Sequence, residues 1–137
     1  MRRYRCGACE DMTIDQALHT VNSLKPHNIE RARLIDWLDR LDRRIFKDVI
    51  STHDPDATTP AAFDGYDQNT DPDTVLLIPP PYDEAYRFYL EMEIDLTNRE
   101  YESYNNNAAL YAAAYGKYAR AYHREHRPLR QGDHLRF

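Results

Sequence analysis

The chain has 137 residues, enough for one domain with its own core, and a formal net charge of -5 at pH 7. A negative total disfavours a protein whose main task is to bind nucleic acid, because such proteins usually carry a strong basic excess. No apolar run approaches the ~20 residues that cross a bilayer, so we expect no membrane contact.

The charge is unevenly distributed along the chain. Residues 54–103 contain thirteen Asp and Glu against two Arg, whereas residues 117–137 contain six Lys and Arg against two acids. A subunit of this kind can meet a copy of itself, or a partner, with opposite charges facing each other. The alternative interpretation is two separate solvated surfaces.

Residues 1–11 precede the first predicted helix and contain Cys6 and Cys9 as a lone C-x-x-C pair. Zinc requires four ligands and no second pair follows, while a thioredoxin-like pair would follow a strand, which we do not predict here. We therefore expect residues 1–11 to be a disordered extension upstream of the domain, which would begin at Met12.

Two helices are predicted before residue 54. Thr13 and Gln16 form a capping-box pattern for the first, which ends at Pro26. Asn28 is the predicted cap of the second, which runs to about His53. The apolar stripe of this second helix consists of Leu34, Trp37, Leu38, Leu41, Ile45 and Val49.

Residues 54–80 are predicted to be a long irregular loop, because they contain five prolines and many Asp and Thr. Within it, 74–78 is a candidate for a short extended segment. Asp67, Asn69 and Asp71 match the first ligand positions of an EF-hand, but a proline and an isoleucine stand where that loop requires Gly and Glu. We therefore interpret these side chains as caps of backbone turns rather than calcium ligands.

A third helix is predicted to start at Pro79–Pro81, with proline accepted in its first turn. Its predicted apolar face consists of Tyr82, Ala85, Tyr86, Tyr89, Met92 and Leu96. Asn98 or the run 105–107 is expected to interrupt the helix, and a fourth helical stretch continues to about Arg127. Residues 129–137 are a predicted flexible basic tail. The predicted fold is all-α, with about four helices in a small bundle over residues 12–128.

The last predicted helix has the most regular pattern in the chain. Aromatic or small residues recur there with alternating spacings of three and four, the heptad period at which two helices stay in contact. They are Tyr101, Tyr104, Ala108, Tyr111, Tyr115, Tyr118 and Tyr122. One interpretation is internal, with the third helix packing antiparallel against this seam. The other is that the Tyr and Ala faces are used both within and between subunits.

The sequence offers little for catalysis. His123 and His126 lie three apart on a helix, but no third ligand is obvious, so we interpret them as a solvated helix end. No nucleophile motif, phosphate loop or glycine-rich cofactor loop is recognisable. We predict a structural protein, with no catalytic residues, cofactor or metal.

The stretch from Asp71 to Glu84, D-P-D-T-V-L-L-I-P-P-P-Y-D-E, resembles head–tail connector (adaptor, or neck) proteins of tailed bacteriophages and of prophages of Gram-positive bacteria. The resemblance extends over residues 12–128, including Trp37-Leu38 and the Tyr/Ala helix. It implies a subunit that forms a homo-oligomeric ring between the portal protein and a tail-proximal neck protein. DNA would pass through the ring without specific binding. The protein would reside in the virion neck, and in the host cytoplasm before assembly.

We expect the 54–80 loop and the basic tail to make intersubunit or partner contacts. The candidate interface residues are Tyr101, Tyr104, Tyr111, Tyr115, Tyr118, Tyr122, Val75, Leu76, Leu77, Ile78, Arg124, Arg127 and Arg130. The alternative function is a small helical nucleic-acid-binding or DNA-packaging accessory protein that uses Arg120 and the arginines after it. A metal-dependent enzyme is a third hypothesis, which would require bound metal in the purified protein.

Overall fold

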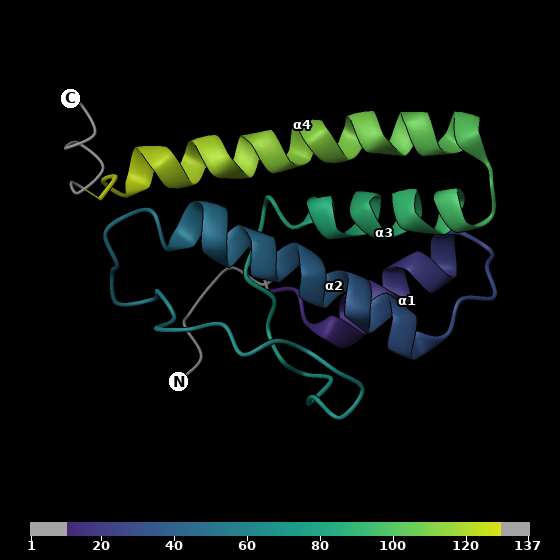
Figure 1. Ribbon diagram of the computed structural model, residues 1–137, viewed down its shortest axis with the longest axis horizontal. Helices are drawn as coiled ribbons and strands as arrows, with labels where there is room; N and C mark the ends of the chain where they lie inside the picture. The colour runs from purple at the N-terminus through teal and green to yellow at the C-terminus, as the bar shows by residue number, and fades with distance from the viewer. Residues whose placement is uncertain (1–10, 130–137) are drawn as a thin grey trace.

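The computed structural model describes residues 11–129, which form an all-α fold as predicted (Figure 1). The elements of this described range are α1 (Ile14–Leu24), α2 (Arg31–Ile45), the π-helical turn η1 (Phe46–Ile50), α3 (Glu84–Thr97) and α4 (Tyr101–Glu125). Helix α4 lies along one side of the molecule, α3 packs beneath it, and α1 and α2 lie below α3. The predictions for Cys6, Cys9, the N-terminal extension and the basic tail from Arg130 onward lie outside the described residues.

Helix α1 begins where the capping pattern predicts. The Thr13 hydroxyl accepts a hydrogen bond from the Gln16 amide, and the Gln16 side chain accepts one from the Thr13 amide, each 3.1 Å long. These reciprocal bonds satisfy two amides that a helix start would otherwise leave free. The buried residues of the helix are Ile14, Ala17, Leu18 and Val21.

Helix α2 begins at Arg31, so the predicted cap at Asn28 is wrong. The ring of His27 accepts a hydrogen bond from the Ile29 amide (3.0 Å), which holds this segment in a turn ahead of the helix. The predicted apolar stripe is buried in full. Helix α2 ends at Ile45 and passes directly into η1, which ends at Ile50 and not near His53. In this wider turn the Ser51 amide donates to the Phe46 carbonyl.

Helix α3 begins at Glu84, after the prolines rather than within them. The Tyr82 amide donates to the Pro79 carbonyl (3.0 Å), closing a turn before the helix starts. Its buried face is centred on Tyr86, Leu90 and Ile94, four residues apart. This orientation turns Leu96 outward, so that Leu96 is 46% exposed instead of lying on the apolar face as predicted.

Helices α3 and α4 form an antiparallel hairpin through the short turn 98–100, where Arg99 has a left-handed backbone (φ 60°). Asn98 therefore ends α3, while the other predicted break, at 105–107, lies inside an uninterrupted helix. Since α4 has 25 residues and α3 has 14, the second half of α4 extends past its partner. That half contacts η1, and residues 127–129 bond to the backbone of residues 52–54.

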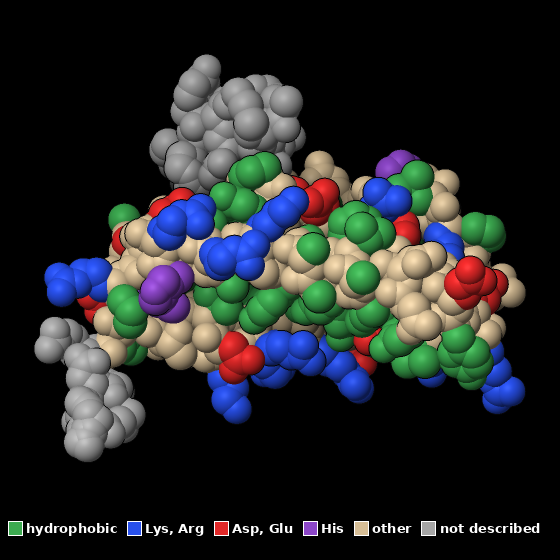
Figure 2. Space-filling model, turned by 90° about the horizontal axis from the view of Figure 1, so that it is seen from above, with side chains coloured by type: hydrophobic (Ala, Val, Ile, Leu, Met, Phe, Trp, Pro, Cys, Tyr) green, Lys and Arg blue, Asp and Glu red, His purple; other side chains and the backbone are tan. Residues whose placement is uncertain are grey.

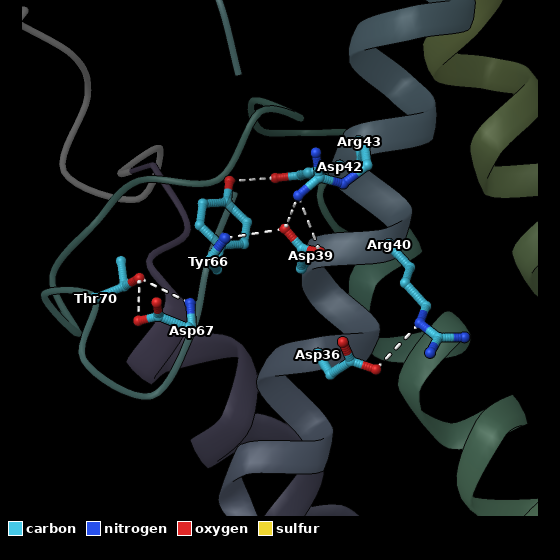
Figure 3. Close-up of polar contacts among 8 residues, drawn as sticks. All are labelled: Asp36, Asp39, Arg40, Asp42, Arg43, Tyr66, Asp67 and Thr70. Atoms are coloured by element: carbon cyan, nitrogen blue, oxygen red, sulfur yellow. Dashed lines mark hydrogen bonds and ion pairs between the residues drawn. The ribbon is translucent and has the colours of Figure 1, made fainter. Parts of the chain in front are cut away.

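A buried aspartate fixes the long connection onto the helices. Asp42 of α2 is completely buried and accepts hydrogen bonds from the hydroxyls of Tyr66 and Tyr86 and from the Leu77 amide. Burial raises the pKa of Asp42 to about 6, against the lowering effect of these donors. Figure 3 shows the Tyr66 part of this arrangement, together with the Tyr66 amide bonded to Asp39. The predicted irregular loop is therefore held in a defined path.

Gly65 permits the loop to approach α2 this closely. Its φ is +93°, a conformation that other residues rarely adopt, and a Cβ there would lie 2.7 Å from the Arg43 guanidinium and 2.9 Å from an Asp39 oxygen. The glycine is therefore needed both for the backbone angle and for the space beside α2.

A second buried carboxylate joins three helices at the other end of the bundle. Lys25, at the end of α1, lies 2.6 Å from Asp95 of α3. Ser103 and Asn107 of α4 each donate to the other Asp95 oxygen at 2.8 Å. Burial favours a higher pKa for Asp95, but these donors hold it below its usual value. The Asp95 hydrogen bond likewise raises the pKa of Lys25.

Candidate functional site

The tyrosine ladder of α4 only partly coincides with the internal packing seam. The buried residues of α4 are Asn107, Ala114, Tyr118 and Ala121. The buried line therefore runs through 107, 114, 118 and 121, so it is rotated from the predicted line of tyrosines. Tyr101, at the start of that line, is 58% exposed, and Tyr104, Tyr111, Tyr115 and Tyr122 are half buried. Helix α3 does pack antiparallel against this helix, as the internal interpretation requires.

The side of α4 that faces away from α3 has no covering element in the described structure. We call its residues the outer stripe; they recur at helical spacing and are Asn106, Ala109, Leu110, Ala113, Lys117, Arg120 and Arg124. All are exposed, and Leu110 is 47% exposed. Figure 2, which looks onto α4, shows hydrophobic side chains along this face with Lys and Arg on both sides. The stripe is thus apolar in its first half and basic in its second.

A basic side chain of α2 also lies beside α4. Burial raises the pKa of Tyr111 to about 12, while the charge of the nearby Arg44 acts to lower it. The pKa of Tyr115 is likewise raised by burial and by the nearby charge of Asp48, against the lowering effect of Arg44. Arg44 is exposed, so a cation of α2 lies near these two tyrosines of α4.

A pocket of about 420 Å³ lies where the end of α4 meets residues 56–60 and 75–79, and we call it the end pocket. Its volume is within the range of natural binding pockets. The apolar residues that line it include Ile50, Val75, Leu76, Leu77, Pro79, Tyr118 and Tyr122. The structure thus brings together two groups of predicted interface residues that are more than 40 positions apart in the sequence. Ile78, from the same predicted segment, is instead fully buried in the core.

The polar side of the end pocket contains a His–Asp pair that the sequence did not reveal. His126 Nε2 lies 2.6 Å from an Asp56 oxygen, and its Nδ1 lies 3.1 Å from the Tyr122 carbonyl. Both nitrogens face acceptors, so both hydrogen bonds form together only when the ring carries two protons. The Thr58 hydroxyl and amide, followed by His126, hold the pKa of Asp56 below its usual range.

These contacts correct the interpretation of the histidines as a solvated helix end. The His126 side chain is 11% exposed and stacks on Tyr122, with ring centroids 3.8 Å apart. His123 is exposed, but its Nδ1 lies 3.2 Å from Nε2 of His53. His126 and Asp56 are 70 residues apart, and no local pattern connects them.

The remaining predicted positions have simple locations. Arg124 and Arg127 are exposed near the end of α4, whereas Arg130 lies outside the described residues. Asp67 accepts hydrogen bonds from the Asn69 amide and the Thr70 hydroxyl, as expected of a turn.

Within residues 11–129, no group of three His, Cys, Asp or Glu could hold a metal ion. No helix of that range is long and apolar enough to cross a membrane.

No family model matches the chain, and comparison with curated proteins and with solved structures finds no significant relative.

Proposed function

We propose that the protein is a structural subunit of a bacteriophage neck, a head–tail connector that assembles into a ring between the portal protein and a tail-proximal protein. The observation that carries this proposal is the uncovered outer stripe of the longest helix. Leu110 and the alanines around it are exposed, although they could pack closely against another helix or loop. A helix that needed only its internal partner would more usually have charged residues at these positions.

The segment that carries the family resemblance supports the same proposal. Within it, Leu77 bonds to Asp42 through its amide, and Val75 pairs with Thr13. Val75 remains 49% exposed beside the end pocket. The segment therefore supplies both core residues and exposed apolar surface, which suits a subunit that contacts other proteins on several sides. We propose the virion neck as its final location, and the host cytoplasm before assembly.

The proposal is tested by the mass of the protein in solution and by its binding to particles of the portal protein encoded nearest to its gene. We expect binding, with several copies on each portal. An Ala113→Arg variant, which places a long charged side chain on the outer stripe, should lose assembly. Ala32→Arg, at an exposed position of α2, is the matched control and should assemble normally. A protein that stays monomeric in all conditions and never binds portal would refute the proposal.

The basic half of the outer stripe favours one other function. Lys117, Arg120 and Arg124 follow one another at spacings of three and four, so they can contact phosphates along one helix face. A DNA-packaging accessory protein would bind duplex DNA with an affinity that falls steeply as salt rises. Titration of labelled duplex DNA at two salt concentrations separates this function from the connector.

A further inference from the structure

This inference rests on the proposed ring and concerns the two surfaces through which neighbouring subunits meet. We propose that the outer stripe of one copy binds the acidic strap of the next copy, the strap being residues 60–73 of the long connection. The first residues of the connection lie beside the end of α4, and its middle part then crosses the side of the molecule opposite to α4 (Figure 1). One subunit therefore carries the two surfaces on opposite sides.

Charge complementarity is the first argument for this pairing. The strap carries four exposed carboxylates, those of Asp64, Asp67, Asp71 and Asp73. The outer stripe carries the exposed cations of Lys117, Arg120 and Arg124. Within residues 11–129, none of these seven side chains forms an ion pair in the structure. Each surface thus has unneutralised charge that the other can neutralise.

The two surfaces also match in their small side chains. Ala109 and Ala113 of the outer stripe allow another backbone to approach closely, and Leu110 stands between them. Ala61 and Ala62 are exposed on the strap. The paired surfaces would thus have a small apolar centre with charged residues around it, the arrangement of an apolar core and a polar rim found in protein interfaces.

The strap is already ordered before it meets a partner. Asp39 and Asp42 hold Tyr66 against α2. Asp67 and Asp71 cap the two turns that follow, through bonds to the amides of Asn69 and Asp73. A preorganised loop loses less conformational entropy on binding, so a modest contact area can suffice.

The locations of the surfaces determine the type of assembly. Pairing two outer stripes in parallel would place like charges together, and pairing them antiparallel would leave the cations of each copy without an opposite charge, so neither two-fold arrangement neutralises this face. Pairing the stripe with the strap is heterologous, because different patches of the two copies meet. Such head-to-tail contacts produce closed rings when the rotation between copies closes.

The test uses charge reversal on each surface. Lys117→Glu/Arg120→Glu makes the stripe acidic. Asp64→Lys/Asp73→Lys brings the strap from four negative charges to a net charge of zero and spares the two aspartates that cap its turns. The matched control is Arg33→Glu, an exposed position of α2. Association is measured by sedimentation velocity at about 50 mM and about 500 mM salt, since screening weakens charge pairing at the higher value.

Each double variant alone should associate roughly tenfold more weakly than the parent chain or worse, because the attraction between its two surfaces is reversed in the stripe variant and cancelled in the strap variant. An equal mixture of the two variants should regain association, with both chains in one complex, because the unchanged strap of the first variant can meet the unchanged stripe of the second. The Arg33→Glu control should associate like the parent chain.

Two results would overturn the pairing: a mixture that associates no better than its components, or double variants that associate like the parent chain. If reversal of the stripe instead abolishes binding to duplex DNA and leaves assembly intact, the stripe is a nucleic-acid surface. Absence of parent-chain association up to about 1 mM also refutes this contact. These results concern the contact between subunits alone. The connector function itself fails only if, in addition, the protein never binds portal particles.

Discussion

Tyr86 is the residue whose hydroxyl most directly joins the long connection to the helical core. It is fully buried on α3, donates to an Asp42 oxygen at 2.7 Å and accepts the Ile78 amide at 2.7 Å. Burial raises the pKa of Tyr86 well above its usual value, so the hydroxyl stays neutral and able to donate. Tyr86→Phe removes this single oxygen and leaves the ring in place.

The expected cost has two parts. A hydrogen bond to a carboxylate contributes about 1.5–3 kcal/mol, and a buried amide left without an acceptor costs about 1–3 kcal/mol. We therefore expect Tyr86→Phe to lower the free energy of unfolding by about 3–5 kcal/mol at pH 7. Tyr66→Phe is the matched control: it deletes the other hydroxyl that donates to Asp42, at a half-buried site. Water can replace that donor, so we expect a loss of about 1–2 kcal/mol.

The assay is urea unfolding monitored by circular dichroism, with the midpoint and slope compared between the two variants and the parent chain. An unchanged slope with a lower midpoint shows a change in stability rather than in the unfolded state. The reasoning is refuted if Tyr86→Phe costs no more than Tyr66→Phe. That result would mean that the Ile78 amide finds another acceptor, and that the hydroxyl of Tyr86 does not hold the connection in place.

Two further predictions concern the buried carboxylates. The pKa of Asp42 is higher in the folded state (about 6) than the ordinary 3.8, so its contribution to stability is present at low pH and is lost as pH rises from about 4 to 6. Asp42→Asn removes this titration. Its unfolding free energy, measured relative to the parent chain by urea titration, should therefore rise by up to about 3 kcal/mol from pH 4 to pH 7, and a flat difference would contradict the raised pKa. Lys25→Met leaves the buried Asp95 without its cation and should cost about 3–5 kcal/mol in thermal or urea unfolding. Arg40→Met, which breaks an exposed helical ion pair with Asp36, should cost less than about 0.5 kcal/mol, and equal losses would show that the Asp95 pair contributes no more than a surface pair.

Local sequence patterns predicted the helices well where the contacts that form them join residues close together in the sequence. The start of α1 followed from Thr13 and Gln16, whose side chains bond only to each other's backbone. The buried stripe of α2 followed from the 3.6-residue period. The start of α2 was missed because the ring of His27 bonds the Ile29 amide and holds a turn that the sequence pattern did not indicate.

The candidate site could be predicted only in part. The apolar segment around Val75 and the tyrosines near residue 120 were identified, but nothing in the sequence indicated that they line one pocket. The same holds for His126 and Asp56, and for the capture of the loop by Asp42. Each of these contacts joins residues from different elements, and one sequence carries no signal for such pairs.

By itself, the sequence determined the all-α class, the start of α1, and the uneven distribution of acidic and basic residues. Those properties depend on neighbours along the chain, so propensity, period and composition are enough to predict them. Only the tertiary structure decided which line of α4 is buried and which carboxylates are enclosed. It also decided that the acidic connection and the basic helix lie on opposite sides. The buried line of α4 follows from how α3 and η1 pack against it, which is a property of the packed elements and not of any one helix alone.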